Sequence, residues 1–342
     1  MNHPLRPITR QKTPTAVKVA GPAAPAWPSY TGASRFVGTS PSGRVTVYVD
    51  ASLGQPGEQN AQDLVSDADR VVQANDQIFG TTGGNVSVIV FALGGNTDGT
   101  GGADHMGCDY TSGNAIEVCA AFGNSARVSA LFEAELSECS MGGNLCGVST
   151  GEALSRWCAA VIGNDALSDF ATAPTWVQDG MQDFVNNTDP SDQNPDSTGC
   201  GMAFISWLMS QGFGLDKIAQ GLVALTANGA FAQLYANLTG DSAGNAWPKF
   251  QAAVNGLAGG GTNDDPFGGG VQPAQLTHIT PGNVELAGKI FGGILRDLAA
   301  GKDGEQIVAN VRAVVATMPK APAGGGPGKS GRLTPPTKRK SA

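Results

Sequence analysis

Three apolar segments in the first half of the chain place the strongest limit on its fold. Arg44–Asp50 alternates apolar and polar residues, and Asn85–Leu93 and Ala115–Ala121 are more continuously apolar, so all three are predicted to be strands. An amphipathic helix is predicted at Glu58–Phe79, between the first two strands. The Gly/Asp-rich crossing at 94–114 is expected to have little regular structure.

Only helices are predicted after the third strand. The first is Ser125–Met141, and the others are Ser149–Ile162, Thr175–Val185, Gly201–Gln211, Leu215–Thr226, Ala230–Leu238 and Ala246–Leu257. This order predicts an α+β fold, in which a small twisted sheet packs on one helical layer and an all-helical half follows.

The helix predicted at Ser125–Met141 has an acidic residue within its apolar stripe. Val128, Phe132, Glu135 and Cys139 recur at helical spacing, and Glu138 lies three residues after Glu135. A carboxylate facing the core is costly unless it is paired. Candidate partners for Glu135 are Arg127, Arg156 or a backbone donor.

Composition divides the chain into five parts. Residues 1–42 are predicted to be a disordered basic arm, 43–257 the folded domain, 258–282 a Gly-rich linker, 283–318 a helical appendage and 319–342 a disordered basic tail. The net charge is −8, and the segments 1–28 and 320–342 contain basic residues but no Asp or Glu. The body is therefore acidic, which argues against nucleic acid as a partner of the core.

No apolar run is long enough to span a bilayer, and no signal peptide is recognised at the N-terminus. The cytoplasm is therefore the default expectation, although the compartment stays open. The six cysteines permit three disulfides without requiring them: Cys108, Cys119, Cys139, Cys146, Cys158 and Cys200. Cys108 and Cys119 are spaced like a cross-strand pair, and Cys139 with Cys146 would close a small loop. The spacing of His105 and Cys108 is only a weak indication of a metal site, because one pair is not a site.

The chain resembles the zincin metallopeptidases in its order of elements and in two motifs. Those enzymes carry His-Glu-x-x-His on the helix after the sheet, and the matching residues here are Ala134 to Glu138. The gluzincin branch, including proteins of the plant basic-secretory type, has Trp-Leu-x-Glu-Gly on a later helix, which Trp176 to Gly180 resembles. Segments 199–222 and 232–241 also resemble an uncharacterised microbial family with the same degenerate helix.

The resemblance implies a base position at Glu135, and metal-ligand positions that have changed. Ala134 has no donor atom, while Glu138 and Asp179 occupy the second and third ligand positions. The expected cluster of Glu135, Glu138 and Asp179, with Arg156 nearby, contains only oxygen donors. Such a cluster disfavours zinc and is better suited to calcium, magnesium, manganese or no metal.

Three functions remain open at this stage. The first is a pseudoenzyme that binds a peptide or protein partner in a cleft between the helices Ser125–Met141 and Thr175–Val185. The second is a hydrolase that uses the acidic cluster or a metal other than zinc. The third is a purely structural or interaction protein, for which Ser149 and Glu152 form a capping box and Glu152 pairs with Arg156 four residues later.

Overall fold

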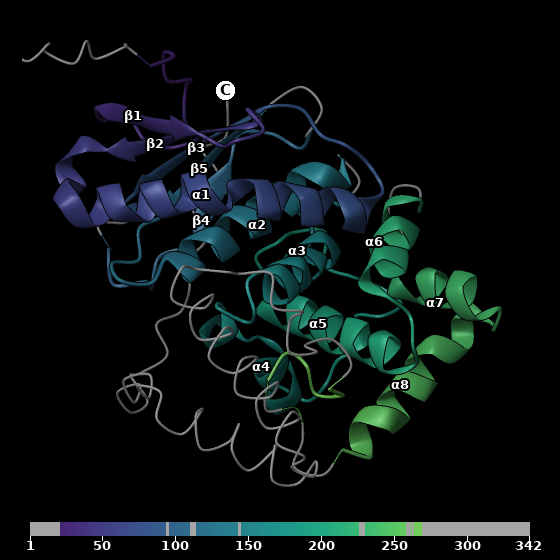
Figure 1. The fold of residues 1–342 in the computed structure, drawn as a ribbon. Coiled ribbons are helices and arrows are strands. Elements are labelled where there is room, and N and C mark those ends of the chain that lie inside the picture. Colours follow the sequence, from purple (N-terminus) through teal and green to yellow (C-terminus); the bar gives the residue numbers. More distant parts are fainter. Residues whose placement is uncertain are drawn as a thin grey trace, which may run out of the picture.

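The structure is a computed structural model that describes residues 21–93, 96–109, 114–142, 145–225, 230–257, 261 and 263–268. It confirms the α+β fold, with a five-stranded sheet followed by helices (Figure 1). The strands are β1 (Ser34–Thr39), β2 (Val45–Asp50), β3 (Val86–Phe91), β4 (Ala103–His105) and β5 (Asn114–Cys119).

The α-helices follow the sheet except for α1, which connects β2 to β3 after a short 3-10 turn. They are α1 (Gly54–Phe79), α2 (Ser125–Met141), α3 (Ser149–Ile162), α4 (Ala173–Gln178), α5 (Pro195–Ser210), α6 (Leu215–Val223), α7 (Phe231–Thr239) and α8 (Ala246–Asn255). The predicted bounds of α2 and α3 are confirmed. No helix in the described ranges is both long and apolar enough to cross a membrane.

The sheet has the order β1-β2-β3-β5-β4 and mixed strand directions. Its three central strands are parallel, with Val45 opposite Val86 and Val86 opposite Asn114. The two edge strands are antiparallel to their neighbours, β1 to β2 and β4 to β5. Parallel strands need a long crossover connection, which α1 provides between β2 and β3.

Both faces of the sheet are covered. On one face, α1 and α2 pack against Val47, Val88 and Val118, all of which have no exposed surface. On the other face, Tyr48, Ile89 and Phe91 are covered by aromatic residues of the segment before β1. This two-sided burial explains why the central strands read as almost continuous apolar runs.

The helical half packs on the side of α2 that faces away from the sheet (Figure 1). Neighbouring helices pack in the sequence α2, α3, α5 and α4, so α3 lies next to α2. Large buried side chains fill the core of this half: Trp157, Trp176, Phe204, Phe231 and Phe250. The sheet and the helical half therefore meet at α2 and α3.

The prediction that the disordered arm extends to residue 42 is wrong for its second part. Residues 21–33 run over the sheet, and Ser34–Thr39 form β1. Trp27 packs edge-on against Tyr48, and Tyr30 packs against Phe91. These aromatic contacts, together with the pairing of β1 with β2, stabilise a Pro-rich segment whose composition alone predicts disorder.

The crossing at 94–114 has little regular structure among its described residues, as expected, apart from the three residues of β4, which are held by their pairing with β5. One further expectation about local structure is wrong. The helix predicted at Thr175–Val185 ends at Gln178, because Gly180 and Met181 both have positive φ values, 97° and 55°. Such values are incompatible with a right-handed helix.

The remaining domain predictions concern residues outside the described ranges. These are residues 1–20 of the arm, most of the linker 258–282, the helical appendage 283–318 and the basic tail 319–342.

Candidate functional site

The candidate site lies where β4, α2 and the start of α3 meet. Helix α2 begins after Asn124, whose side chain accepts a hydrogen bond from the backbone N–H of Arg127 at 3.2 Å. It ends at Met141 and is followed by the cap residue Gly142, which has a φ of 69° that favours glycine. The helix packs on β4, β5, α1 and α3. The side chains of Glu135 and Glu138 therefore lie between the edge of the sheet and the helical half.

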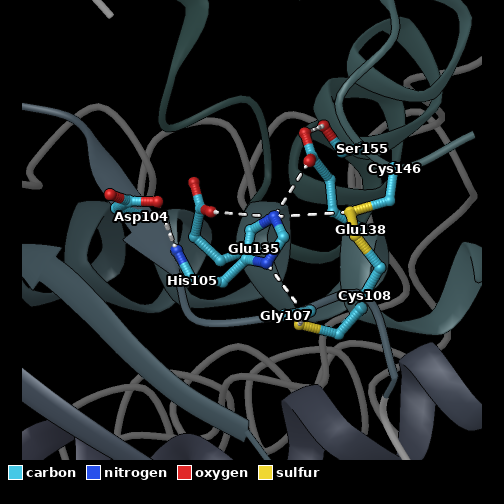
Figure 2. Close-up of a disulfide and its surroundings, with 9 residues drawn as sticks. Asp104, His105, Gly107, Cys108, Glu135, Glu138, Cys146 and Ser155 are labelled. Carbon is cyan, nitrogen blue, oxygen red and sulfur yellow. Dashed lines mark hydrogen bonds and ion pairs between the residues drawn. A yellow bond between two sulfur atoms is a disulfide. The ribbon is translucent and has the colours of Figure 1, made fainter. Parts of the chain in front are cut away.

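His105, the last residue of β4, is the centre of the site. Its Nε2 atom lies 3.1 Å from Oε2 of Glu138 and 4.0 Å from Oε2 of Glu135. Its other ring nitrogen, Nδ1, lies 2.9 Å from the carbonyl oxygen of Gly107. Figure 2 shows the imidazole between the two glutamates. Both ring nitrogens are therefore engaged by the protein.

The surroundings of His105 favour its charged form. Burial lowers the pKa of an imidazole, but hydrogen bonds with Cys139 and Glu138 and the charge of Glu135 outweigh burial here and raise the pKa of His105 to about 12. His105 and Glu138 are therefore a nearly buried ion pair, with side chains only 12% and 9% exposed.

Glu135 and Glu138, both on α2, have opposite pKa shifts. Burial, followed by the nearby charge of Glu138, raises the pKa of Glu135 well above its usual range. Burial alone would also raise the pKa of Glu138, but hydrogen bonds with His105 and Glu152 lower it overall. The site therefore favours the protonated form of Glu135 and the ionised form of Glu138.

Helix α3 adds a second ion pair. Oε1 of Glu152 accepts a hydrogen bond from Nε of Arg156 at 2.7 Å, which confirms the pairing predicted from their spacing. The pKa of Glu152 is raised to about 7, mainly by burial. The charge of Arg156 lowers this pKa, whereas the charge of Glu138 raises it further. Because Glu138 and Glu152 also share a hydrogen bond, the network runs from His105 to Arg156.

A disulfide closes one side of the site. Cys108, just after β4, is bonded to Cys146, just before α3 (Figure 2). Sγ of Cys146 lies 3.8 Å from Nε2 of His105. Both pairings suggested by the spacing are therefore wrong, since Cys119 and Cys139 are buried free thiols. Sequence proximity could not reveal this bond, because it joins segments that only the fold brings together.

Asp179 is not joined to this cluster by any contact among the described residues. It is exposed at the C-terminal end of α4, and its charge contributes to a raised pKa of Asp196. Helix α4 packs on α5 instead of α2. The expected convergence of Asp179 with Glu135 and Glu138 is therefore not seen, and Glu152 takes the place of the third carboxyl group.

The zinc ligands implied by the zincin resemblance do not fit this site. Ala134 has no donor atom, Glu138 is engaged by His105, and Asp179 is exposed. A different set of metal-binding atoms does come together, from His105, Glu138 and Cys146, which lie within 4.8 Å of one another. In the oxidised chain, however, Cys146 is held in the disulfide.

Two local expectations are also corrected. Ser149 does not cap α3, because the cap residue is Val148 and the Ser149 hydroxyl donates to the carbonyl oxygen of Asp189 at 2.9 Å. Arg127 does not pair with Glu135, because its guanidinium binds Asp169 at 2.6 Å. The cationic partner of Glu135 is His105 at 4.0 Å, which was not among the partners expected from the sequence.

The comparisons with known proteins do not assign a family. No protein-family model matches the chain, and no curated protein matches it. One similar solved structure is described as yeast LTA4 hydrolase in complex with bestatin, with 14% identity and a TM-score of 0.34. The similarity covers 78% of this chain and 44% of that one, so this chain spans less than half of its length. With these values the similarity carries no argument about function, which must be argued from the site itself.

Proposed function

We propose that the domain is a non-catalytic binding module with a peptidase-type arrangement of sheet and helix. The observation that supports this proposal is the position of His105, whose ring lies 3.1 Å from Glu138 and 4.0 Å from Glu135. An imidazolium between two glutamates supplies the positive charge that a cation would otherwise supply. Glu138 then has its counter-charge within hydrogen-bond distance inside the protein.

Catalysis by a metal-bound water would need an open coordination position and a free general base. Glu135, at the base position, has a side chain that is only 15% exposed, and burial and the charge of Glu138 both disfavour its ionised form. Ala134 removes the first ligand altogether. We therefore assign Glu135, Glu138, Glu152 and Arg156 to a network that holds the fold rather than to a reaction.

The test is a cleavage assay with purified full-length protein. Casein is incubated with wild type and with a Glu135→Gln variant, and fragments are measured by mass spectrometry. Neither protein is expected to cleave casein above a buffer control. Cleavage by the wild type that is lost in the variant would overturn the proposal.

We place the binding surface for an extended peptide at β4. β4 is an edge strand of the sheet, next to β5, and an extended peptide that adds to a sheet pairs with an edge strand. Met106, directly after β4, is 50% exposed and would offer an apolar contact beside that edge. This replaces the cleft expected between α2 and α4, because α3 lies next to α2.

A defined peptide mixture tests this surface. Immobilised peptides from a casein digest are expected to retain the wild type, and Met106→Lys is expected to weaken the retention. Phe122→Lys is the matched control, because Phe122 is the other large apolar side chain exposed among the described residues, at 40%. Equal loss in both variants, or no retention of the wild type, would contradict binding at β4.

Hydrolysis by a carboxyl pair is the second candidate function. It is favoured by the opposite pKa shifts of Glu135 and Glu138, since an acid and a base need environments that separate their pKa values. In this case Glu135 would donate a proton and Glu138 would accept one. The cleavage assay above separates this candidate from the first, because it predicts activity that Glu135→Gln abolishes.

A further inference from the structure

We propose that reduction of the Cys108–Cys146 disulfide opens a tetrahedral zinc site formed by Nε2 of His105, a carboxylate oxygen of Glu138 and the two freed sulfur atoms. This site shares only Glu138 with the positions that the zincin resemblance implies. It lies at the junction of β4, α2 and α3, and it is independent of whether the domain has lost catalysis.

The separations of the donor atoms fit zinc. Nε2 of His105 is 3.1 Å from Oε2 of Glu138 and 3.8 Å from Sγ of Cys146. Tetrahedral zinc, with bonds of about 2.0–2.1 Å to nitrogen or oxygen and about 2.3 Å to sulfur, places a nitrogen about 3.3 Å from an oxygen ligand and about 3.6 Å from a sulfur ligand. The separations from His105 to two other ligands thus match zinc geometry, and the donor atoms of Glu138 and Cys146 lie within 4.8 Å of each other.

The histidine is also held in the orientation that a metal ligand needs. Its Nδ1 lies 2.9 Å from the carbonyl oxygen of Gly107, so an N–H at Nδ1 can donate there and leave Nε2 as the metal-binding atom. Glu138 is contacted on its other oxygen, because Ser155 Oγ lies 3.4 Å from its Oε1, leaving Oε2 directed at His105. Such outer contacts orient ligands before the metal arrives.

The fourth ligand comes from the disulfide itself. The Cα atoms of Cys108 and Cys146 are 5.9 Å apart, so both sulfur atoms stay in the site after the bond breaks. A thiol reductant supplies the two electrons. Two RSH molecules become RSSR, the sulfur–sulfur bond is cleaved, and each cysteine receives one hydrogen. Zinc then binds the thiolates as the two thiol protons, and the proton at Nε2, pass to solvent.

The resulting coordination is closed. Two sulfurs, one nitrogen and one oxygen fill all four positions, which is the pattern of structural rather than catalytic zinc. Sulfur and nitrogen donors also disfavour calcium, magnesium and manganese, which were expected from a purely carboxylate cluster. The covalent link between the end of β4 and the start of α3 is thereby replaced by a link through the metal ion.

The experiment uses full-length protein in two redox states. One sample is kept oxidised, and the other is reduced with a dithiol and freed of reductant without oxygen. Each is mixed with zinc chloride, desalted and measured for bound zinc by elemental analysis. The reduced chain is expected to retain one zinc per chain and the oxidised chain none. Equal zinc in both states, or none in the reduced state, would overturn the proposal.

Variants and cobalt substitution identify the ligands. Reduced Cys146→Ser and His105→Gln are expected to lose stoichiometric zinc, whereas Cys119→Ala, which changes a free cysteine outside the cluster, is expected to retain it. Circular dichroism verifies that each variant is folded. Cobalt bound to the reduced wild type should show a thiolate charge-transfer band in the near ultraviolet. Cobalt binding without this band would overturn the assignment of Cys108 and Cys146 as ligands.

Discussion

At the scale of single residues, Glu133 differs from the other acidic groups of α2. Its side chain has no exposed surface, and neither carboxyl oxygen has a hydrogen-bond partner among the described residues. Burial raises its pKa well above the usual range, and the charge of Arg70 opposes this only in part. The folded chain therefore favours the protonated form of Glu133.

This protonation predicts a pH dependence of stability. The folded chain keeps the proton of Glu133 while the unfolded chain loses it above a pKa of about 4.5, so stability falls as pH rises from there toward the raised folded value. Glu133→Gln should remove this part of the fall. Urea unfolding from pH 4 to pH 8 should show that the free energy of unfolding of the variant increases relative to that of wild type as pH rises. Asp179→Asn, at an exposed carboxyl, serves as the control and should follow wild type.

The pair formed by His105 and Glu138 predicts a strong coupling. Removing one partner leaves a buried charge, which costs about 3–5 kcal/mol, while replacing both with apolar residues costs much less. His105→Leu and Glu138→Leu should each lower the free energy of unfolding strongly, and the double variant should lose less than their sum. The measurement is urea unfolding of oxidised protein with a chelator present. Additive losses would show that the two residues do not act as a pair.

Part of this site could be predicted from sequence. Glu135, Glu138, Glu152 and Arg156 lie on helices, where spacing alone shows which side chains are neighbours. His105 was considered only for its spacing to Cys108, because its role depends on a three-residue strand that pairs with β5. In sequence His105 is separated from α2 by β5, so chain proximity gives no signal for its contact with Glu135 and Glu138.

At the scale of elements, long periodic helices were predicted well and short elements were not. The segments of α2 and α3 have many apolar positions at helical spacing and buried faces. By contrast, α4 ends early because Gly180 and Met181 take positive φ values. Backbone conformation at two residues leaves no periodic trace in the sequence, so the longer helix was expected there.

A close approach between elements predicts an unusual effect of alanine. A Cβ atom at Gly199 in α5 would lie 2.4 Å from the carbonyl oxygen of Thr172, next to the start of α4. Gly199→Ala should therefore destabilise the chain, although alanine is favoured over glycine by about 1 kcal/mol in a helix interior. Gly221→Ala in α6 is the matched control, because its Cβ would meet only a terminal methyl of Leu234. Thermal melts should show a marked drop in Tm for the first and little change for the second.

At the scale of the whole molecule, the disulfide joins the edge of the sheet to the helical half. It closes a loop between residues 38 apart in sequence. A cross-link of this span is expected to stabilise the folded chain by about 3–4 kcal/mol, mainly by restricting the unfolded chain.

This predicts the cost of losing the bond. The double variant Cys108→Ser/Cys146→Ser should lose about 3–4 kcal/mol of unfolding free energy relative to oxidised wild type. Chemical denaturation with a chelator present measures the loss. Adding a reductant to wild type should reproduce it, and adding the reductant to the double variant should change nothing. A further loss in the reduced variant would point to a second disulfide.

The burial of the other thiols sets an order of events during folding. Cys119, Cys139, Cys158 and Cys200 are all enclosed in the core, while Cys108 and Cys146 are only partly buried. Six cysteines allow 15 complete pairings in an unfolded chain. If the chain folds before it is oxidised, Cys108 and Cys146 are the cysteines placed to form a disulfide. If it is oxidised first, mispaired disulfides must be reduced before the core can form.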